Sequence, residues 1–272
     1  WQTISQYTTP LTTQGDILYR DASGDQRLAA GTSGQVLTSG GSGANVSWTT
    51  PASGFDPDVS TINIGSNAGA VNPGSSSVNI GSAAGYANAG TESVNIGDAA
   101  GYGGAGDYSV SIGDAAGYGG GGDNSVCIGR RAGYNTGDNN IKIGYQAGYS
   151  GANADHNTFV GYEAGYSGNT SDNNVAIGSY ALRAYTVDGA VALGYEALKE
   201  NTTGAKNTGI GYQAGKAVTT GTLNTALGHE ALTDCTTGEK NTAVGGQALE
   251  AVTTGSDNCA LGYIALRGVT TG

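Results

Sequence analysis

The chain is poor in the residues that usually fill a globular core. Its 272 residues include no Met, two Phe and two Trp, and only 12% of them are charged. Glycine is abundant instead: it occurs 50 times, well above the average usage of roughly 7%. Gly costs backbone entropy in helices and strands, so we expect no long helices. A single chain of this composition would also bury too little apolar surface to fold alone.

Positive charge is scarce as well. The chain has 11 Lys and Arg against 22 Asp and Glu, a formal net charge of −11. Binding to nucleic acid requires Lys and Arg on the phosphates, so we expect neither nucleic acid nor an anionic membrane surface as a partner. The excess charge is expected to keep the protein soluble. There is no run of about 20 apolar residues that could insert into a membrane, and we expect no signal peptide.

Clustered metal ligands and catalytic groups are also lacking. The three cysteines, Cys127, Cys235 and Cys259, are far apart, no CxxC occurs, and the only histidines are His156 and His229. A zinc site needs clustered ligands, and a catalytic base needs an orienting partner and a nucleophile within reach. We therefore predict that the protein is not an enzyme, with no catalytic, cofactor-binding or metal-binding residues and no cofactor. The cysteines are expected to be small apolar fillers.

What the sequence does contain is an internal repeat. Thirteen units fill residues from about 58 to the end, and each has an aliphatic residue followed by an anchor glycine. Successive anchors are 15 to 17 residues apart: Gly65, Gly81, Gly97, Gly113, Gly129, Gly144, Gly161, Gly178, Gly194, Gly211, Gly228, Gly245 and Gly262. Because the chain starts at Trp1 and stops at Gly272 in mid-pattern, we expect it to be a piece of a longer polypeptide.

Each unit shows an alternation of period two before its anchor. The residue before the glycine is always aliphatic, and the residue two positions earlier is mostly Val, Ile or Thr. This pattern predicts a short strand whose inner face is carried by the aliphatic residue before the glycine. The residue between them changes from Asn to Ala along the chain, which suits a less apolar environment. Three residues after the anchor stands Ala in all thirteen units, so we expect a tightly packed position, closed by partner chains.

The rest of each unit is rich in turn formers, with Gly-rich loops in early units and Thr-Thr-Gly in late ones. We predict an all-β fold: a parallel β-roll or solenoid of 13 coils of 16–17 residues, each made of strand, bend, short second strand and turn. At an inter-strand spacing of roughly 4.8 Å, the rod would be roughly 60 Å long. A thin coil has a second face to bury, so we expect an intertwined or side-by-side homotrimer with parallel axes.

Two regions follow from this division. Residues 1–57 form an N-terminal β segment or connector, with short β runs at 17–19 and 35–38 between Gly/Ser turns. Residues 58–272 form the repeat shaft, with Gly/Tyr-rich units at about 58–170 and Thr-Thr-Gly units at about 171–272.

The core strings of the repeat resemble two related families. Residues 174–178 (NVAIG) and 224–228 (NTALG) are similar to the head repeat of trimeric autotransporter adhesins, a left-handed parallel β-roll within a homotrimer. Residues 207–215 (NTGIGYQAG) and 241–249 (NTAVGGQAL) look like the repeat array of phage tail fibres, and residues 12–48 resemble a segment common in those proteins. The early Gly/Tyr-rich units depart from both patterns.

The resemblance implies a structural role. We expect a shaft of a trimeric virion fibre, a phage tail fibre, that projects a host-receptor-binding tip and contacts itself and other virion or tail proteins. The alternative is a bacterial or viral adhesin, extracellular or on a cell surface, whose repeats bind host polysaccharide or matrix. A glycan-cleaving tailspike is disfavoured because no carboxylate pair recurs at a plausible site.

Four smaller patterns have competing interpretations. The strings at 104–107 and 120–123 resemble a calcium-binding nonapeptide, but the period is wrong and turn formation is preferred. Asp98 and Asp114 would hold a cation only if they faced a threefold axis. The Thr-Thr-Gly ladder is better explained by turns than by ice binding. Two Tyr columns are expected to cover a protomer seam rather than bind glycans: Tyr86, Tyr102, Tyr118, Tyr134, Tyr149 and Tyr166 in one, and Tyr145, Tyr162, Tyr195, Tyr212 and Tyr263 in the other.

Overall fold

The computed structural model describes residues 13–33, 35–39, 44–49, 61–71, 74–87, 89–150, 154–168 and 170–271. Contacts divide the chain into two units, Trp1–Asp58 and Val59–Gly272, and each is described by itself. The described residues form strands, turns and bends, with no helix among them.

The first unit contains two antiparallel hairpins. Strand β1 (Ile17–Asp21) pairs with β2 (Gly24–Leu28), and β3 (Val36–Ser39) pairs with β4 (Val46–Thr49). Asp16 supports the first hairpin, because its carboxylate accepts a hydrogen bond from Ala30 N at 3.1 Å and forms an ion pair with Arg27 at 2.8 Å. These strands overlap the two β runs expected in this region.

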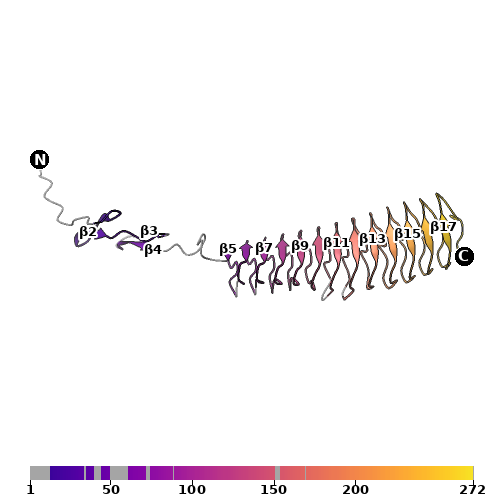
Figure 1. Ribbon diagram of the computed structural model, residues 1–272, viewed down its shortest axis with the longest axis horizontal. Helices are drawn as coiled ribbons and strands as arrows, with labels where there is room; N and C mark the ends of the chain where they lie inside the picture. Colours follow the sequence, from indigo (N-terminus) through magenta and orange to yellow (C-terminus); the bar gives the residue numbers. More distant parts are fainter. Residues whose placement is uncertain are drawn as a thin grey trace. The chain divides into compact units, whose positions relative to one another are not determined.

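The second unit is a β-solenoid, as the repeat predicted. Thirteen three-residue strands form one parallel sheet in strict sequence order, and they follow one another along a single row (Figure 1). Each strand begins one coil, and we name the coil by its strand. The strands are β5 (Ile62–Ile64), β6 (Val78–Ile80), β7 (Val94–Ile96), β8 (Val110–Ile112), β9 (Val126–Ile128), β10 (Ile141–Ile143), β11 (Thr158–Val160), β12 (Val175–Ile177), β13 (Val191–Leu193), β14 (Thr208–Ile210), β15 (Thr225–Leu227), β16 (Thr242–Val244) and β17 (Cys259–Leu261).

The predicted orientation of the strands was wrong. In β6, the middle residue Asn79 is fully buried, whereas Val78 and Ile80 on either side are only half-buried, and the same pattern recurs through most of the sheet. Side chains alternate across a strand, so the small or polar middle residue faces the inside of the coil and the two aliphatic residues face outward. The period of two correctly indicated that the two sides of the strand differ. We had assumed that the more apolar side faces the interior, and it faces outward instead.

The expected second strand is also absent from the described coils. The segment after the bend is a turn, and its hydrogen bonds run to the next coil: Gly85 N donates to Ala100 O, and Gly101 N to Ala116 O, both at 2.8 Å. The second and the fourth residue after the anchor have left-handed backbone, as in Glu163 (φ 50°) and Leu182 (φ 49°), and this prevents an extended strand there. Backbone hydrogen bonds therefore continue from coil to coil even where the backbone is not in a β conformation.

The anchor glycine is required by both conformation and space. Its φ lies between 124° and 140° in all thirteen coils, a region that L side chains rarely adopt. In twelve of the coils, an added Cβ would lie only 2.3–2.8 Å from the carbonyl oxygen of the next anchor. Neighbouring backbones therefore touch at this point, and no other residue fits.

The repeated alanine is enclosed by its own chain. Ala84, Ala116, Ala164 and Ala197 are each completely buried in the single chain. The expectation that partner chains close this position was therefore wrong, because the walls of its own and adjacent coils already do so. Any argument for association must rest on another surface.

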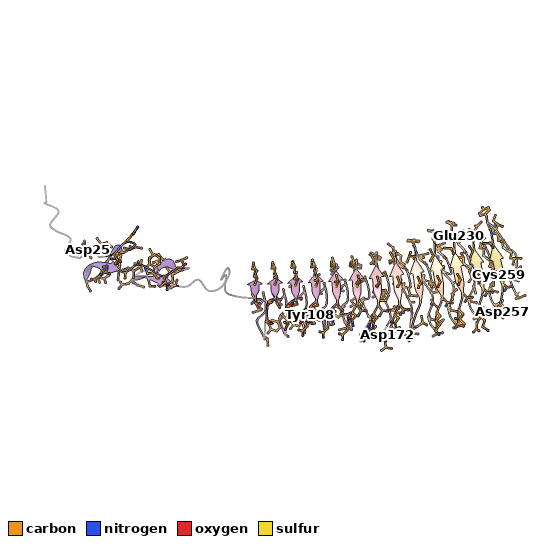
Figure 2. All side chains as sticks on the ribbon, viewed as in Figure 1. Asp25, Tyr108, Asp172, Glu230, Asp257 and Cys259 are labelled. Carbon is orange, nitrogen blue, oxygen red and sulfur yellow. The ribbon has the colours of Figure 1, made fainter. Side chains whose placement is uncertain are left out.

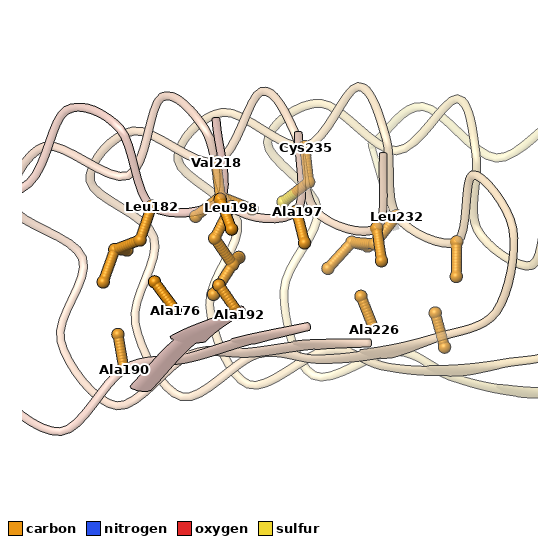
Figure 3. Packing of buried hydrophobic residues seen from close by; sticks show 14 of the residues in the cluster. Ala176, Leu182, Ala190, Ala192, Ala197, Leu198, Val218, Ala226, Leu232 and Cys235 are labelled. Atoms are coloured by element: carbon orange, nitrogen blue, oxygen red, sulfur yellow. The ribbon is translucent and has the colours of Figure 1, made fainter. Parts of the chain in front are cut away.

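Inside the coil, the middle strand residue and the residue after the repeated alanine complement each other in size. Late coils pair Ala176, Ala192 and Ala226 with Leu182, Leu198 and Leu232, which point toward those alanines across the interior (Figure 3). The β11 coil reverses the pair: Phe159 is buried, and a Cβ on Gly165 would lie 2.7 Å from its ring. The β14 coil has glycine at both positions, Gly209 and Gly215, and Leu198 of the β13 coil lies against them. The interior is therefore filled from either position or from the adjacent coil rather than by one residue type.

Buried amides connect successive coils. In most late units the residue before the strand is Asn. Its Oδ1 accepts the backbone N–H of the equivalent residue in the next coil, as in Asn224 N to Asn207 Oδ1 at 2.8 Å and Asn241 N to Asn224 Oδ1 at 2.9 Å. Early coils use Asn inside the strand: Asn95 Nδ2 donates to Asn79 Oδ1 at 2.9 Å. These ladders satisfy most of the buried polar groups that form them; Asn95 Oδ1, at the end of the early ladder, has no partner among the described residues.

Candidate interaction surface

The outward face of the thirteen-stranded sheet is the main candidate surface. It consists of two aliphatic columns, one from the first and one from the third residue of each strand. The third residue is Ile, Val or Leu in every coil. The first is Ile or Val in eight coils, Thr in β11, β14, β15 and β16, and Cys259 in β17. Parallel pairing places each of them directly over its equivalent.

Much of this face is open to solvent in the single chain. Ile64 is 46% exposed, Ile141 43%, Ile177 40% and Leu227 42%. Stacking along the column covers the sides of each residue but leaves its tip free. An extended apolar stripe of this kind is uncommon on a monomer and marks an interaction surface.

Two aromatic columns run along the solenoid. Rings of the first column stack with centroids 4.8–5.4 Å apart, from Tyr86 to Tyr166. The second column continues from Tyr145 and Tyr162 through Tyr180, whose ring stands edge-on to its neighbours, to Tyr195 and Tyr212. Because stacked rings cover each other's faces, the stacked stretches present mainly ring edges to the outside.

His229 belongs to this second column. Its imidazole stacks on Tyr212 at 5.1 Å, with an interplanar angle of 13°, and Nδ1 lies 3.4 Å from a Glu230 carboxylate oxygen. Its position is therefore explained by ring stacking. His156 is exposed, in a left-handed turn before β11 (φ 58°), and far along the chain from His229.

The loop side of the coil carries polar ladders. One ladder is a column of equivalent aspartates in the turns. The Oδ1 of each accepts a hydrogen bond from the backbone N–H of the equivalent residue in the preceding coil: Asp107 N donates to Asp123 and Asp155 N to Asp172, both at 2.8 Å. Figure 2 shows Asp172 among these loops, below the strands in that view. In the late coils the first Thr of Thr-Thr-Gly acts similarly: Thr219 Oγ1 donates to Thr236 O at 2.9 Å. Both columns therefore form turns that link successive coils.

Charged side chains form local networks. Burial would raise the pKa of Glu196, but hydrogen bonds from Lys199, Lys216 and Gln213 lower that pKa to about 2. Arg183 pairs with Glu163 at 2.6 Å and lies over the Tyr166 ring at 5.3 Å. Asp114 pairs with Arg130 at 3.0 Å within the chain, whereas Asp98 is exposed. A cation held at this position stays a prediction, because it requires copies of the position from three chains to meet at a threefold axis.

The sequence analysis missed one buried group, Lys142. It is the middle residue of β10 and is completely buried, above Cys127, its register partner in β9. Burial lowers the pKa of Lys142 to about 8, against smaller effects of Cys127 and Asp155. Burial also raises the pKa of Cys127 to about 11, opposed by Lys142. The signal was present, since no other unit has a charged residue between its two aliphatic positions.

Within the described residues, no group of three or more His, Cys, Asp or Glu is placed to hold a metal ion. The same part of the chain has no helix with the length and apolar character needed to span a bilayer. All three cysteines are free, with Cys127 and Cys235 buried and Cys259 exposed.

Comparison with known proteins adds no relatives. No family model matches the chain, and no match was found among curated proteins or solved structures. The fold therefore defines the protein as a parallel β-solenoid, and its function has to be inferred from its surfaces.

Proposed function

We propose that the chain is the shaft of a homotrimeric virion fibre, such as a phage tail fibre, that projects a host-receptor-binding tip. The observation that carries this proposal is the outward aliphatic face, continuous over thirteen strands in register. Water-exposed aliphatic columns would be buried if copies of the same face met around a common axis.

The number of chains follows from the resemblance, since both similar families form parallel homotrimers. The geometry of the face is compatible with a parallel arrangement, because each column repeats at the spacing between coils. Three identical solenoids aligned along one axis could therefore place equivalent residues at the same height in every coil.

A mechanical role is supported by the hydrogen bonding between coils. Bonds link each coil to the next at the strand, at the bend, and at the turn, as in Gly97 N to Ile80 O (2.8 Å), Ala99 N to Ser82 O (2.8 Å) and Tyr108 N to Thr91 O (2.9 Å). Extension or bending would have to break several bonds at once, so such a rod is suited to acting as a rigid spacer.

The rival function is adhesion by the repeats themselves. It is favoured by the exposed tyrosines Tyr162, Tyr195 and Tyr212, because aromatic side chains often bind sugars through their faces. Stacking covers those faces along most of the column, which weakens this alternative. We propose no catalytic role.

Two experiments separate these functions. Native mass spectrometry of the fragment tests the assembly, and a stable folded monomer at micromolar concentration would exclude the trimer. In the intact fibre, splicing the tip onto a shorter shaft should leave host attachment unchanged if the repeats are a spacer. Lost attachment with an intact tip would instead support the adhesin.

Engineered cysteines can locate the interface. Val175→Cys, on the outward face, should give disulfide-linked chains under mild oxidation if this face is the contact, whereas Thr203→Cys, on an exposed turn, should not. Both variants are made with Cys259 replaced by Ser, because Cys259 is itself exposed on this face. Cross-linking through Thr203→Cys alone would assign the contact to another surface.

A further inference from the structure

The interior of the solenoid brings one thiol and one amine together in adjacent coils. Register pairing sets Lys142 of β10 directly beside Cys127 of β9, and both are middle residues that face inward. Neighbouring inward side chains do reach each other in this fold, as the 2.9 Å hydrogen bond between Asn95 and Asn79 shows.

The Lys142 side chain extends back toward the β9 coil, where the thiol lies. Its Nζ donates a hydrogen bond to Thr136 Oγ1 at 2.5 Å, and Thr136 belongs to the β9 coil. The glycines on the opposite wall provide the space. A Cβ on Gly133 would lie 2.4 Å from Cys127 Sγ and 3.3 Å from Lys142 Cδ, and one on Gly148 would lie 2.7 Å from Lys142 Cε. Sulfur and the end of the lysine stem therefore share one small, closed space.

We propose that Lys142 and Cys127 form a covalent nitrogen–oxygen–sulfur bridge when the protein is exposed to dioxygen. The overall step is R–NH₂ + R′–SH + O₂ → R–NH–O–S–R′ + H₂O. Dioxygen is reduced by four electrons, two taken from nitrogen and two from sulfur; one oxygen atom enters the bridge and the other leaves as water with the amine and thiol protons. The bridge joins the β9 and β10 coils, next to the change from a polar to an apolar interior at Phe159.

Burial encloses both groups together, away from solvent. A solvated cysteine is oxidised stepwise to sulfenic and sulfinic acids, whereas Cys127 is only 1% exposed. The amine is held in a site where its charged form is disfavoured, with Thr136 as its hydrogen-bond acceptor within the described residues. Cys127 and Asp155 are the titratable groups that act on it.

Intact-mass spectrometry tests the bridge on the full chain. Protein kept in air should gain about 14 Da over protein prepared without oxygen and with a thiol reductant, and the reductant should reverse the gain. Cys127→Ser and Lys142→Met should each abolish it, whereas Cys235→Ser, which removes a buried thiol without a lysine beside it, should not. Circular dichroism checks that each variant is folded.

Peptide mapping of the unmodified sequence keeps the test valid even if a variant fails to fold. A cross-linked species containing both Cys127 and Lys142 supports the bridge. No mass change in air, a gain of about 16 or 32 Da on Cys127 alone, or a loss of about 17 Da from amide formation with a neighbouring asparagine would each overturn it. Because the reaction uses the neutral amine, its initial rate should rise several-fold between pH 7 and 9.

Discussion

At the scale of single residues, Lys142 is the least expected group in the solenoid, because a cation here is enclosed without exposure to water. Its pKa is lowered from 10.5 to about 8, so the folded state binds the proton less tightly than the unfolded state. The resulting penalty is fully present below about pH 8 and disappears as the pH rises toward the unfolded value. Stability should therefore increase over this range as far as Lys142 is concerned.

Comparison with Lys142→Met isolates this effect. The variant should be more stable than the unmodified protein at pH 7, and its advantage should shrink by about 1 kcal/mol at pH 9. Urea unfolding in the presence of reductant provides the measurement, and the ionisation of Cys127 in the unfolded chain is common to both proteins. A pH-independent difference would show that the folded state does not lower the pKa of Lys142, which would then stay charged over the whole range.

The anchor glycines give a second prediction. Gly97→Ala should destabilise the solenoid by about 3 kcal/mol or more, since it adds strain at a φ of 136° and a Cβ only 2.5 Å from Gly113 O. Gly268→Ala is the matched control, because nothing lies within 4 Å of its Cβ position. Thermal unfolding of the two variants should separate them clearly; equal midpoints would contradict the proposed backbone contact.

At the scale of one coil, the β11 and β12 coils carry their large side chain at opposite members of two facing positions, Phe159 in one and Leu182 in the other. Phe159→Ala should cost about 3–5 kcal/mol through the cavity that it leaves. Adding Gly165→Leu should restore much of this, because Ala and Leu are the pair used by the β12 coil and Leu182 tolerates the same left-handed backbone. Gly165→Leu alone should overpack the interior.

A double-mutant cycle measured by denaturant unfolding tests this complementarity. The expected result is a favourable interaction energy between the two substitutions. If the free-energy changes of the two substitutions simply add, the side chains at these two positions do not compensate for each other's size.

The repeated alanine leads to a related prediction. Ala197→Leu should destabilise the isolated chain by about 1–3 kcal/mol, because the site is already closed by its own coils. The loss should be the same whether or not the chains associate, which equilibrium unfolding at two protein concentrations would reveal. A loss seen only in the oligomer would restore a partner-chain contact at this position.

Some features of a coil could be predicted from the sequence and others could not, because different physical constraints act on the anchor glycine, the strand and the segment after the bend. The anchor glycines fixed the number of coils and the position of every strand, because no other residue satisfies that backbone. Hydrophobicity could not show which side of the strand faces the interior, since Asn79 and Lys142 face inward while Ile64 faces outward. The second strand was expected from period alone, and left-handed residues such as Glu163 and Leu182 have no sequence signature that would have excluded it.

At the scale of the whole molecule, the finding that the aliphatic strand residues face outward changes the argument for association. With aliphatic residues inside, the solenoid would have been a self-sufficient rod with a polar exterior. With these residues outside, a single chain leaves its most apolar face in water, and the proposal of a partner chain rests on this face. The candidate surface was thus present in the sequence from the start, but it was assigned to the interior.

The last prediction concerns this face. Ile177→Glu combined with Ile210→Glu should leave each coil intact, since both residues point away from the interior. In a homotrimer that buries this face, the substitutions would bring carboxylates from three chains together without counterions, at a cost that exceeds the gain from association. The double variant should therefore be a folded monomer by native mass spectrometry and circular dichroism, whereas Thr203→Glu, on an exposed turn, should keep the assembly of the unmodified chain. If the double variant retains the trimer mass, the chains associate through a different face, and the aromatic columns become the next surface to test by the same substitutions.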